Sequence, residues 1–189
     1  MSYQTKIGIQ VFSAAVLAGC MVVPRPSLDE LNALNNPPPH VQEKVNRFFP
    51  RALAWFKQAE VDLQMRGRIL TESEKAQARK LGVRHPDAVR VVVLETFPMP
   101  ADPDLRTESE RYGLGSRHEG GRTMGSVILL KPWAADNPSV LVHELVHISQ
   151  FERLGREAYL RRYIIEMEMM GYARSPLELE AFARQREAH

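Results

Sequence analysis

Two histidines four residues apart, with a glutamate directly after the first, are the residues of this sequence best suited to chemistry. On an α-helix, positions i and i+4 lie on one face, so His143 and His147 can direct their imidazole nitrogens at one metal ion. Glu144 is rotated by about 100° from His143 and is therefore poorly placed as a third ligand. From there its carboxylate can take a proton from a water molecule on the ion. The pattern predicts a metal site with a general base beside it.

The residues around this pattern indicate a buried helix. No Lys, Arg or Asp occurs between Pro138 and Phe151, and the immediate neighbours of the three polar residues are Val, Leu and Ile. A helix that is apolar on nearly all sides is a buried one, and buried polar groups are costly without partners. A core helix whose histidines bond to nearby carbonyl groups is the alternative interpretation. Two histidines and a glutamate together in an uncharged helix favour the metal site.

The five residues from His143 to His147 resemble the active-site helix of the zincin metalloproteases. A metzincin would have Gly at Gln150 and His at Arg153, so the resemblance is to a minimal gluzincin, whose third ligand is a glutamate on a later helix. The segment from Leu141 to Ala181 also resembles bacterial domains that pair His-Glu-Leu-x-His-x-x-Gln with a later Pro-x-Glu-x-Glu-Ala. The resemblance implies Zn²⁺ as cofactor, a peptide or protein as substrate, and Glu144 as the general base of peptide-bond hydrolysis.

The resemblance implies a third ligand on the last helix. In gluzincin-like patterns the ligand glutamate is followed by a small residue three positions later and by Asp or Asn four positions later. Glu178 has Ala181 and Phe182 at these places, so an expected acceptor for a ligand histidine is missing. Glu180 fits the pattern less well and is the alternative ligand. Glu178 also follows Ser175 by three residues, where its carboxylate would complete a capping box instead.

The motif does not identify a hydrogen-bond donor that would stabilise the negative charge of the transition state. The candidates are His118 and the tyrosines that follow the motif, of which we name Tyr163. His118 lies in the glycine-rich segment 113–125, which suits either a loop over a site or a plain hairpin turn. It is also a fallback metal ligand, although an exposed loop histidine is the commoner explanation.

Composition excludes other classes of function. The chain has 189 residues, which suits one domain, and 25 basic against 23 acidic residues give a net charge of +2. In the most basic region, Arg66 to Arg90, acidic residues are interleaved and aromatic residues are absent, so no nucleic-acid surface is predicted. Cys20 is the single cysteine, which excludes an internal disulfide.

The residues that precede Cys20 resemble a bacterial lipoprotein signal. Lys6 is followed by an apolar run from Ile7 to Gly19, and small residues stand directly before the cysteine. In such signals the cysteine is lipidated, which predicts a protein anchored in the bacterial envelope and facing the periplasm. The alternative is a buried N-terminal helix or strand in a cytoplasmic protein. The run is too short for an ordinary transmembrane helix.

The elements that must position the motif are mostly helical. Residues 1–40 are expected to be a signal-like and linker segment, and residues 41–189 a zincin-like domain. Capping residues, prolines and periodicity predict helices over 41–65 (divided at Pro50), 71–81, 103–112, 138–154, 157–170 and from 175 onward, and strands over 89–97 and 126–130. The expected fold class is α+β, with a small sheet packed on the helix that carries the two histidines, as in a minimal zincin.

Two functions of different classes remain open. The first is a zinc-dependent metallopeptidase. The second is a non-catalytic zincin-like interaction module with a structural or vestigial zinc site, which the missing Asp or Asn after Glu178 and the absence of a clear oxyanion donor favour. A helical domain without metal is a third.

Overall fold

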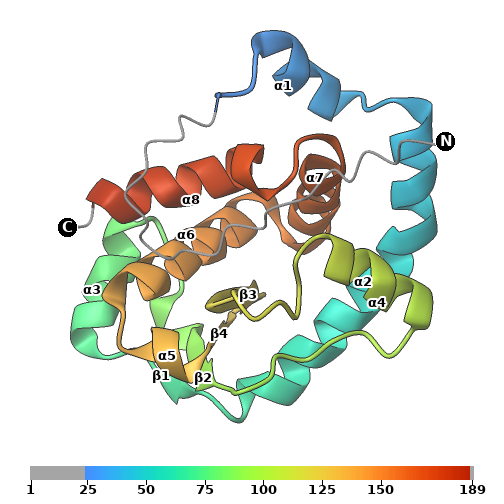
Figure 1. The fold of residues 1–189 in the computed structure, drawn as a ribbon. Coiled ribbons are helices and arrows are strands. Elements are labelled where there is room, and N and C mark those ends of the chain that lie inside the picture. Colours follow the sequence, from blue (N-terminus) through green and yellow to red (C-terminus); the bar gives the residue numbers. More distant parts are fainter. Residues whose placement is uncertain (1–23, 188–189) are drawn as a thin grey trace, which may run out of the picture.

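Residues 24–187, the part of the chain that the computed structural model describes, form an α+β fold in which helices surround a small mixed sheet (Figure 1). Within this range no helix is both long enough and apolar enough to cross a membrane. The lipoprotein-like segment that ends at Cys20 lies outside the described residues.

The α-helices and 3-10 helices follow in this order: α1 (Leu28–Asn35), α2 (Pro39–Gln64), α3 (Glu72–Lys80), η1 (Pro86–Ala88), α4 (Pro103–Arg111), α5 (Pro132–Ala135), α6 (Pro138–Leu154), α7 (Arg156–Met169), η2 (Tyr172–Arg174) and α8 (Pro176–Glu187). The sheet has the order β1-β2-β4-β3, with strands β1 (Arg68–Ile69), β2 (Arg90–Val93), β3 (Gly121–Met124) and β4 (Val127–Leu130). β2 and β4 are parallel, and the two outer pairs are antiparallel.

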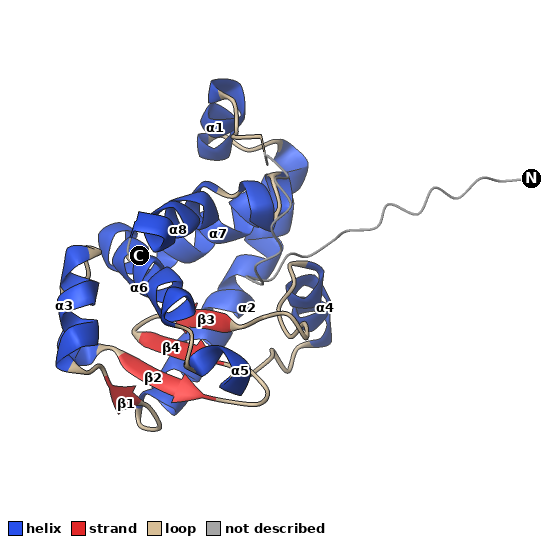
Figure 2. Cartoon of the chain, turned by 60° about the vertical axis from the view of Figure 1, so that its left-hand side comes forward, coloured by secondary structure: helices blue, strands red, loops and turns tan. Residues whose placement is uncertain are grey.

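The sheet separates two apolar clusters. Successive side chains of a strand point to opposite faces, and both Val91 and Val92 are buried. Val92 and Leu129 belong to the cluster with α2 and α7, whereas Val91 and Ile128 belong to the cluster with α3 and α6. Figure 2 shows α6 between α8 and the sheet, with β3 as the strand beside it. The predicted strand over 89–97 is confirmed only in its first half, Arg90–Val93, where Val91 and Val92 are buried on opposite faces.

The helix α2 continues through Pro50, so the prediction of two helices divided there is wrong. A proline inside a helix removes a hydrogen bond and costs about 3 kcal/mol. Apolar side chains on both sides of it, among them Val45 and Phe56, are buried in one cluster with side chains of α7. Each such burial stabilises the fold by about 1.5–3 kcal/mol, so the burial of several side chains by one continuous helix outweighs the cost of the proline.

Two regions are more ordered than their composition indicates. The linker-like segment contains α1, whose Leu34 is buried and whose Glu30 carboxylate accepts two hydrogen bonds of 2.8 Å from Arg174. The glycine-rich segment 113–125 contains β3, which no periodicity predicted. It pairs with β4 through a turn at Gly125, whose φ is +67°.

The predicted boundaries of α6 are confirmed. The Asn137 side chain accepts a hydrogen bond of 3.0 Å from the Ser139 N–H, and Pro138 takes the first helical position. Gly155, with φ of +82°, ends the helix. Every residue from 140 to 150 is buried. Both histidines and Glu144 are therefore held on a rigid element away from bulk water.

Candidate metal centre

Three side chains from α6 and α8 meet in the interior. Nε2 of His143 lies 3.1 Å from Nε2 of His147 and 3.2 Å from Oε2 of Glu178. Nε2 of His147 lies 3.5 Å from the same carboxylate oxygen. The three ligand atoms all lie within 4.8 Å of one another, and the three residues are buried. Such a group can hold a metal ion.

The structure brings Glu178, and not Glu180, to the histidines. The Glu180 carboxylate instead accepts hydrogen bonds from Arg153 at 2.8 Å and from the Gln150 amide at 3.1 Å. The two residues are separated by about 200° around the helix, so only one of them can face α6 with its carboxylate at the cluster.

The start of α8 explains why the Glu178 carboxylate is free for this role. The Ser175 hydroxyl accepts a hydrogen bond of 3.3 Å from the Glu178 N–H, as a capping residue does. The reciprocal contact from Glu178 is not made, because the Ser175 N–H donates to the Gly171 carbonyl at 3.0 Å. The start of the helix is also held by the buried Glu166 of α7. Its carboxylate accepts hydrogen bonds from the Ser175 hydroxyl at 2.6 Å and from the Leu177 N–H at 3.0 Å. Glu166 thus anchors the helix that carries Glu178.

Each imidazole has an amide oxygen at its second nitrogen. Oε1 of Gln150 lies 2.8 Å from Nδ1 of His147, and Oε1 of Gln185 lies 3.2 Å from Nδ1 of His143. These acceptors favour the tautomer with the proton on Nδ1, which leaves the lone pair of Nε2 directed at the cluster. The Phe182 ring packs on His143 with centroids 4.7 Å apart. Gln185, one turn beyond Phe182, therefore supplies the acceptor that the sequence pattern lacks.

The general-base candidate Glu144 faces β3 rather than the cluster. The Thr123 hydroxyl donates a hydrogen bond of 2.7 Å to its Oε2. At Gly121, a Cβ atom would lie only 2.5 Å from Oε1 of Glu144, so the absence of a side chain there makes room for the carboxylate. Gly121 and Thr123 stand at alternate positions of the strand and share a face. Sequence reasoning missed both because the strand itself was not predicted.

Electrostatics suit Glu144 for proton transfer. Burial raises the pKa of its carboxyl group, against the opposing charges of His147 and His143 and the Thr123 hydrogen bond. A carboxyl group whose pKa moves up toward neutrality both accepts and returns a proton more readily.

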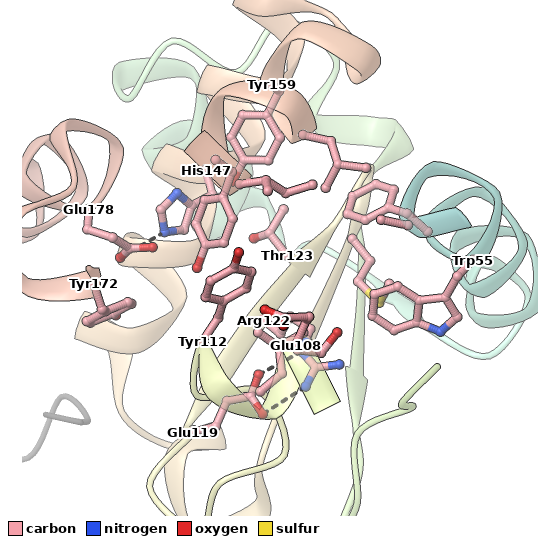
Figure 3. A pocket seen from close by; sticks show the side chains of 18 of the residues that line it. Trp55, Glu108, Tyr112, Glu119, Arg122, Thr123, His147, Tyr159, Tyr172 and Glu178 are labelled. Carbon is pink, nitrogen blue, oxygen red and sulfur yellow. Dashed lines mark hydrogen bonds and ion pairs between the residues drawn. The ribbon is translucent and has the colours of Figure 1, made fainter. Parts of the chain in front are cut away.

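Two adjoining pockets border the cluster. A cavity of about 150 Å³ reaches from Glu178 and His147, past Thr123, to Trp55 (Figure 3). A smaller one of about 80 Å³ is lined by His118 and Trp133. His143, Glu144, Tyr163 and Tyr172 line both pockets, so the base and a ligand are accessible from either.

The two candidate donors differ in their surroundings. Tyr163 is half-buried, and the desolvation of its hydroxyl raises the pKa of this group well above the usual value. Its hydroxyl stays protonated at neutral pH and remains a donor. His118 is exposed, lines only the smaller pocket, and lies 3.0 Å through Nε2 from Nε of Arg117. Among residues 24–187 it is not part of a group that could hold a metal ion.

Without metal, His147 and Glu178 form a buried ion pair. Burial alone would lower the pKa of His147, but the charge and hydrogen bond of Glu178 raise it to about 9. Burial likewise opposes the ionisation of Glu178, yet the charge of His147 and the hydrogen bond to His143 hold the pKa of the carboxyl group well below its usual range.

We expect the metal-free protein to lose stability as pH rises from about 6.5 to about 9. A folded-state pKa of His147 raised from 6.5 to about 9 contributes stability that is complete below pH 6.5 and is lost as pH rises through the higher value. The lowered pKa of Glu178 contributes stability above about pH 4.5 that is lost on acidification. Urea unfolding in EDTA across this range measures the effect, and His147→Gln should flatten the alkaline slope. An unchanged slope in that variant would contradict the assignment.

Comparison with known proteins found no relative of this chain. No protein-family model, curated protein or solved structure matches the chain. The case for a function is therefore made from the residues of α6, α8 and β3.

Proposed function

We propose that the chain is a zinc-dependent metallopeptidase of minimal zincin-like fold. The observation that carries the proposal is the separation of roles at one pocket: His143, His147 and Glu178 converge on a single point, while Glu144 of α6 stands beside them and faces β3. Two imidazoles and one carboxylate are a known ligand set for catalytic zinc, which leaves a position for water or substrate. When bound, zinc would polarise the scissile carbonyl and make an attacking water more acidic.

The side chains of the site divide the remaining work. Glu144 accepts the proton of the attacking water and returns it to the leaving amine nitrogen. Thr123 fixes the orientation of that carboxylate through its 2.7 Å hydrogen bond. Gln150 and Gln185 hold the two imidazoles in the ligand tautomer. We assign the donor to the developing oxyanion to Tyr163, because it lines both pockets and its hydroxyl stays protonated at neutral pH.

The strand β3 gives the substrate a place to bind. It is the last strand in the order β1-β2-β4-β3, so one of its edges has no partner strand among residues 24–187. An extended peptide can add to such an edge through main-chain hydrogen bonds. Because Gly121 and Thr123 of β3 contact Glu144, a peptide paired there would run directly past the base.

One of the two observations that favoured the non-catalytic alternative has another explanation. This observation is Phe182, which stands where a ligand-orienting Asp or Asn was expected. Gln185 supplies an acceptor to His143 at 3.2 Å in its place. Attachment to the bacterial envelope through Cys20 is a separate proposal, supported by the lipoprotein-like residues that precede it.

The proposal is tested by incubating the zinc-loaded protein with a library of quenched fluorescent peptides. We expect cleavage that stops when a chelator removes the metal and returns when zinc is restored. A zinc-loaded protein that cleaves no peptide in the library would leave the interaction module as the better assignment.

Replacing Gly121 by alanine should displace the base without removing the metal. The added Cβ would lie 2.5 Å from Oε1 and 3.0 Å from Cδ of Glu144, so this side chain must shift off Thr123. A shift of about 1 Å at a catalytic group lowers kcat/KM by up to about 100-fold. We expect kcat/KM to fall by about 10- to 100-fold while the zinc content is unchanged. A peptide assay measures the first quantity and elemental analysis the second. Thr123→Ser keeps the hydroxyl on the same strand and should retain most of the activity.

A further inference from the structure

The larger cavity extends well beyond the metal ligands into an apolar pocket. Its walls come from α2, α4, β3 and α7, which apart from α7 lie outside the segment that resembles a known family. The apolar side chains that line it include Phe48, Ala52, Trp55, Phe56, Leu105 and Leu160. The same cavity is bordered by His147 and Glu178, so it opens directly onto the site (Figure 3).

The size of this pocket matches one apolar ring. Protein interiors are packed so closely that voids larger than a water molecule are few. The whole cavity, including the part that borders the metal ligands, has a volume of about 150 Å³, which is the size of an engineered apolar cavity that binds benzene. A space of this volume, apolar and open to a candidate active site, is suited to a ligand group.

The charged residues in the walls are already paired. Nζ of Lys44 lies 2.8 Å from the Glu108 carboxylate, and Nε of Arg122 lies 2.6 Å from that of Glu119. Lys44 and Glu108 also line a more open pocket on the outer side, so their ion pair lies between the two spaces. With these charges neutralised in place, a charged group entering the pocket would lose its hydration without gaining a partner.

The geometry of β3 connects the pocket to a bound peptide. Thr123 faces α6 and Glu144, whereas the next residue, Met124, belongs to the apolar cluster of α2 and α7 on the opposite face. The cavity is lined by both residues and therefore passes around the free edge of the strand. A peptide paired with this edge would alternate its side chains between the same two faces. One side chain near the scissile bond would consequently point into the apolar pocket.

We propose that this pocket binds a single apolar side chain of the substrate peptide, of the size of phenylalanine or leucine. The inference rests on the proposed peptidase function for the identity of the ligand. The pocket would then determine which peptides are cleaved, by admitting an apolar ring or branched chain and rejecting charged residues at that position.

Binding to the zinc-loaded Glu144→Gln variant tests the inference without requiring turnover. The probes are short, neutral alanine–serine peptides with one central Phe, Leu, Asp or Ala. Trp55 lines the pocket and is one of two tryptophans, so its fluorescence in a Trp133→Phe background reports occupancy. We expect the Phe and Leu peptides to bind about 10- to 100-fold more tightly than the Ala and Asp peptides, as burial of one such side chain implies. Equal affinities would overturn the inference.

Two substitutions with a matched control locate the effect. Ala52→Leu fills the pocket and should remove the preference for Phe, whereas Leu160→Ala enlarges it and should shift the preference toward Trp. Ala54 lies two residues away on the exposed face of the same helix, so Ala54→Leu should leave the preference unchanged. A preference for Phe that survives both pocket variants would overturn the inference. Failure of the wild-type protein to cleave peptides would refute the peptidase function, which is a different result from the loss of selective binding.

Discussion

Glu144→Gln should abolish peptide cleavage while the protein still binds one zinc ion per chain. Glutamine fills nearly the same volume and can keep the contact with Thr123, but its amide cannot take a proton from water. A positioned general base contributes about 10²- to 10⁴-fold to a rate, so we expect kcat/KM to fall by at least that factor. Zinc should remain, because Glu144 is not one of the three converging side chains. The measurements are cleavage of a quenched fluorescent peptide and elemental analysis of the same preparation.

A matched substitution controls for the loss of one negative charge. Glu157 lies on α7 with a side chain that is 66% exposed, and its nearest cation is Lys57 at 3.6 Å. Exposed pairs of this kind contribute little to stability, so Glu157→Gln should behave as the wild type. Cleavage by Glu144→Gln at the wild-type rate would eliminate Glu144 as the base, whatever the zinc content.

The parts of the site that lie on one helix could be predicted from the sequence. The spacing of His143, Glu144 and His147 follows from the 3.6-residue period, and the boundaries of α6 follow from Asn137, Pro138 and Gly155. Burial of the helix followed from its lack of charge. These features depend on residues close in the chain, and local physical chemistry determines them.

The partners that complete the site depend on contacts between distant elements. Gln185 reaches His143 only because α8 packs along α6, and Thr123 reaches Glu144 only because a strand forms in a glycine-rich segment. Gln185 does share a helix face with Glu178, seven residues or about two turns earlier, and this spacing was an available sign. No comparable sign existed for β3, since glycine and charge are both rare in strands. Likewise, α2 is continuous through Pro50 because apolar side chains on both sides of the proline are buried against other helices.

His147→Ala should remove the zinc, and with it both cleavage and the stabilisation that zinc provides. The variant deletes one of three ligands, leaves the Gln150 amide oxygen without its buried imidazole partner, and leaves the Glu178 carboxylate with His143 alone of the two imidazoles. Loss of a residue that merely orients a ligand lowers metal affinity about 10- to 100-fold, so removal of a ligand itself should exceed 100-fold. Elemental analysis after dialysis against trace zinc measures this directly.

Thermal unfolding separates loss of the metal from loss of the fold. A ligand that binds only the native state raises its stability by mass action, so added zinc should raise the Tm of the wild type and of His118→Ala, whose imidazole is exposed and outside the cluster. In His147→Ala the Tm should not respond to zinc. Glu178→Gln keeps the volume of the side chain but lacks the charge, and it should also lose the response. Without the ion pair to His147 it should still fold, with a lower Tm. Undiminished zinc in His147→Ala, or none in the wild-type protein, would remove the basis for a metal centre between α6 and α8. The buried His147–Glu178 ion pair would then serve only to hold the two helices together.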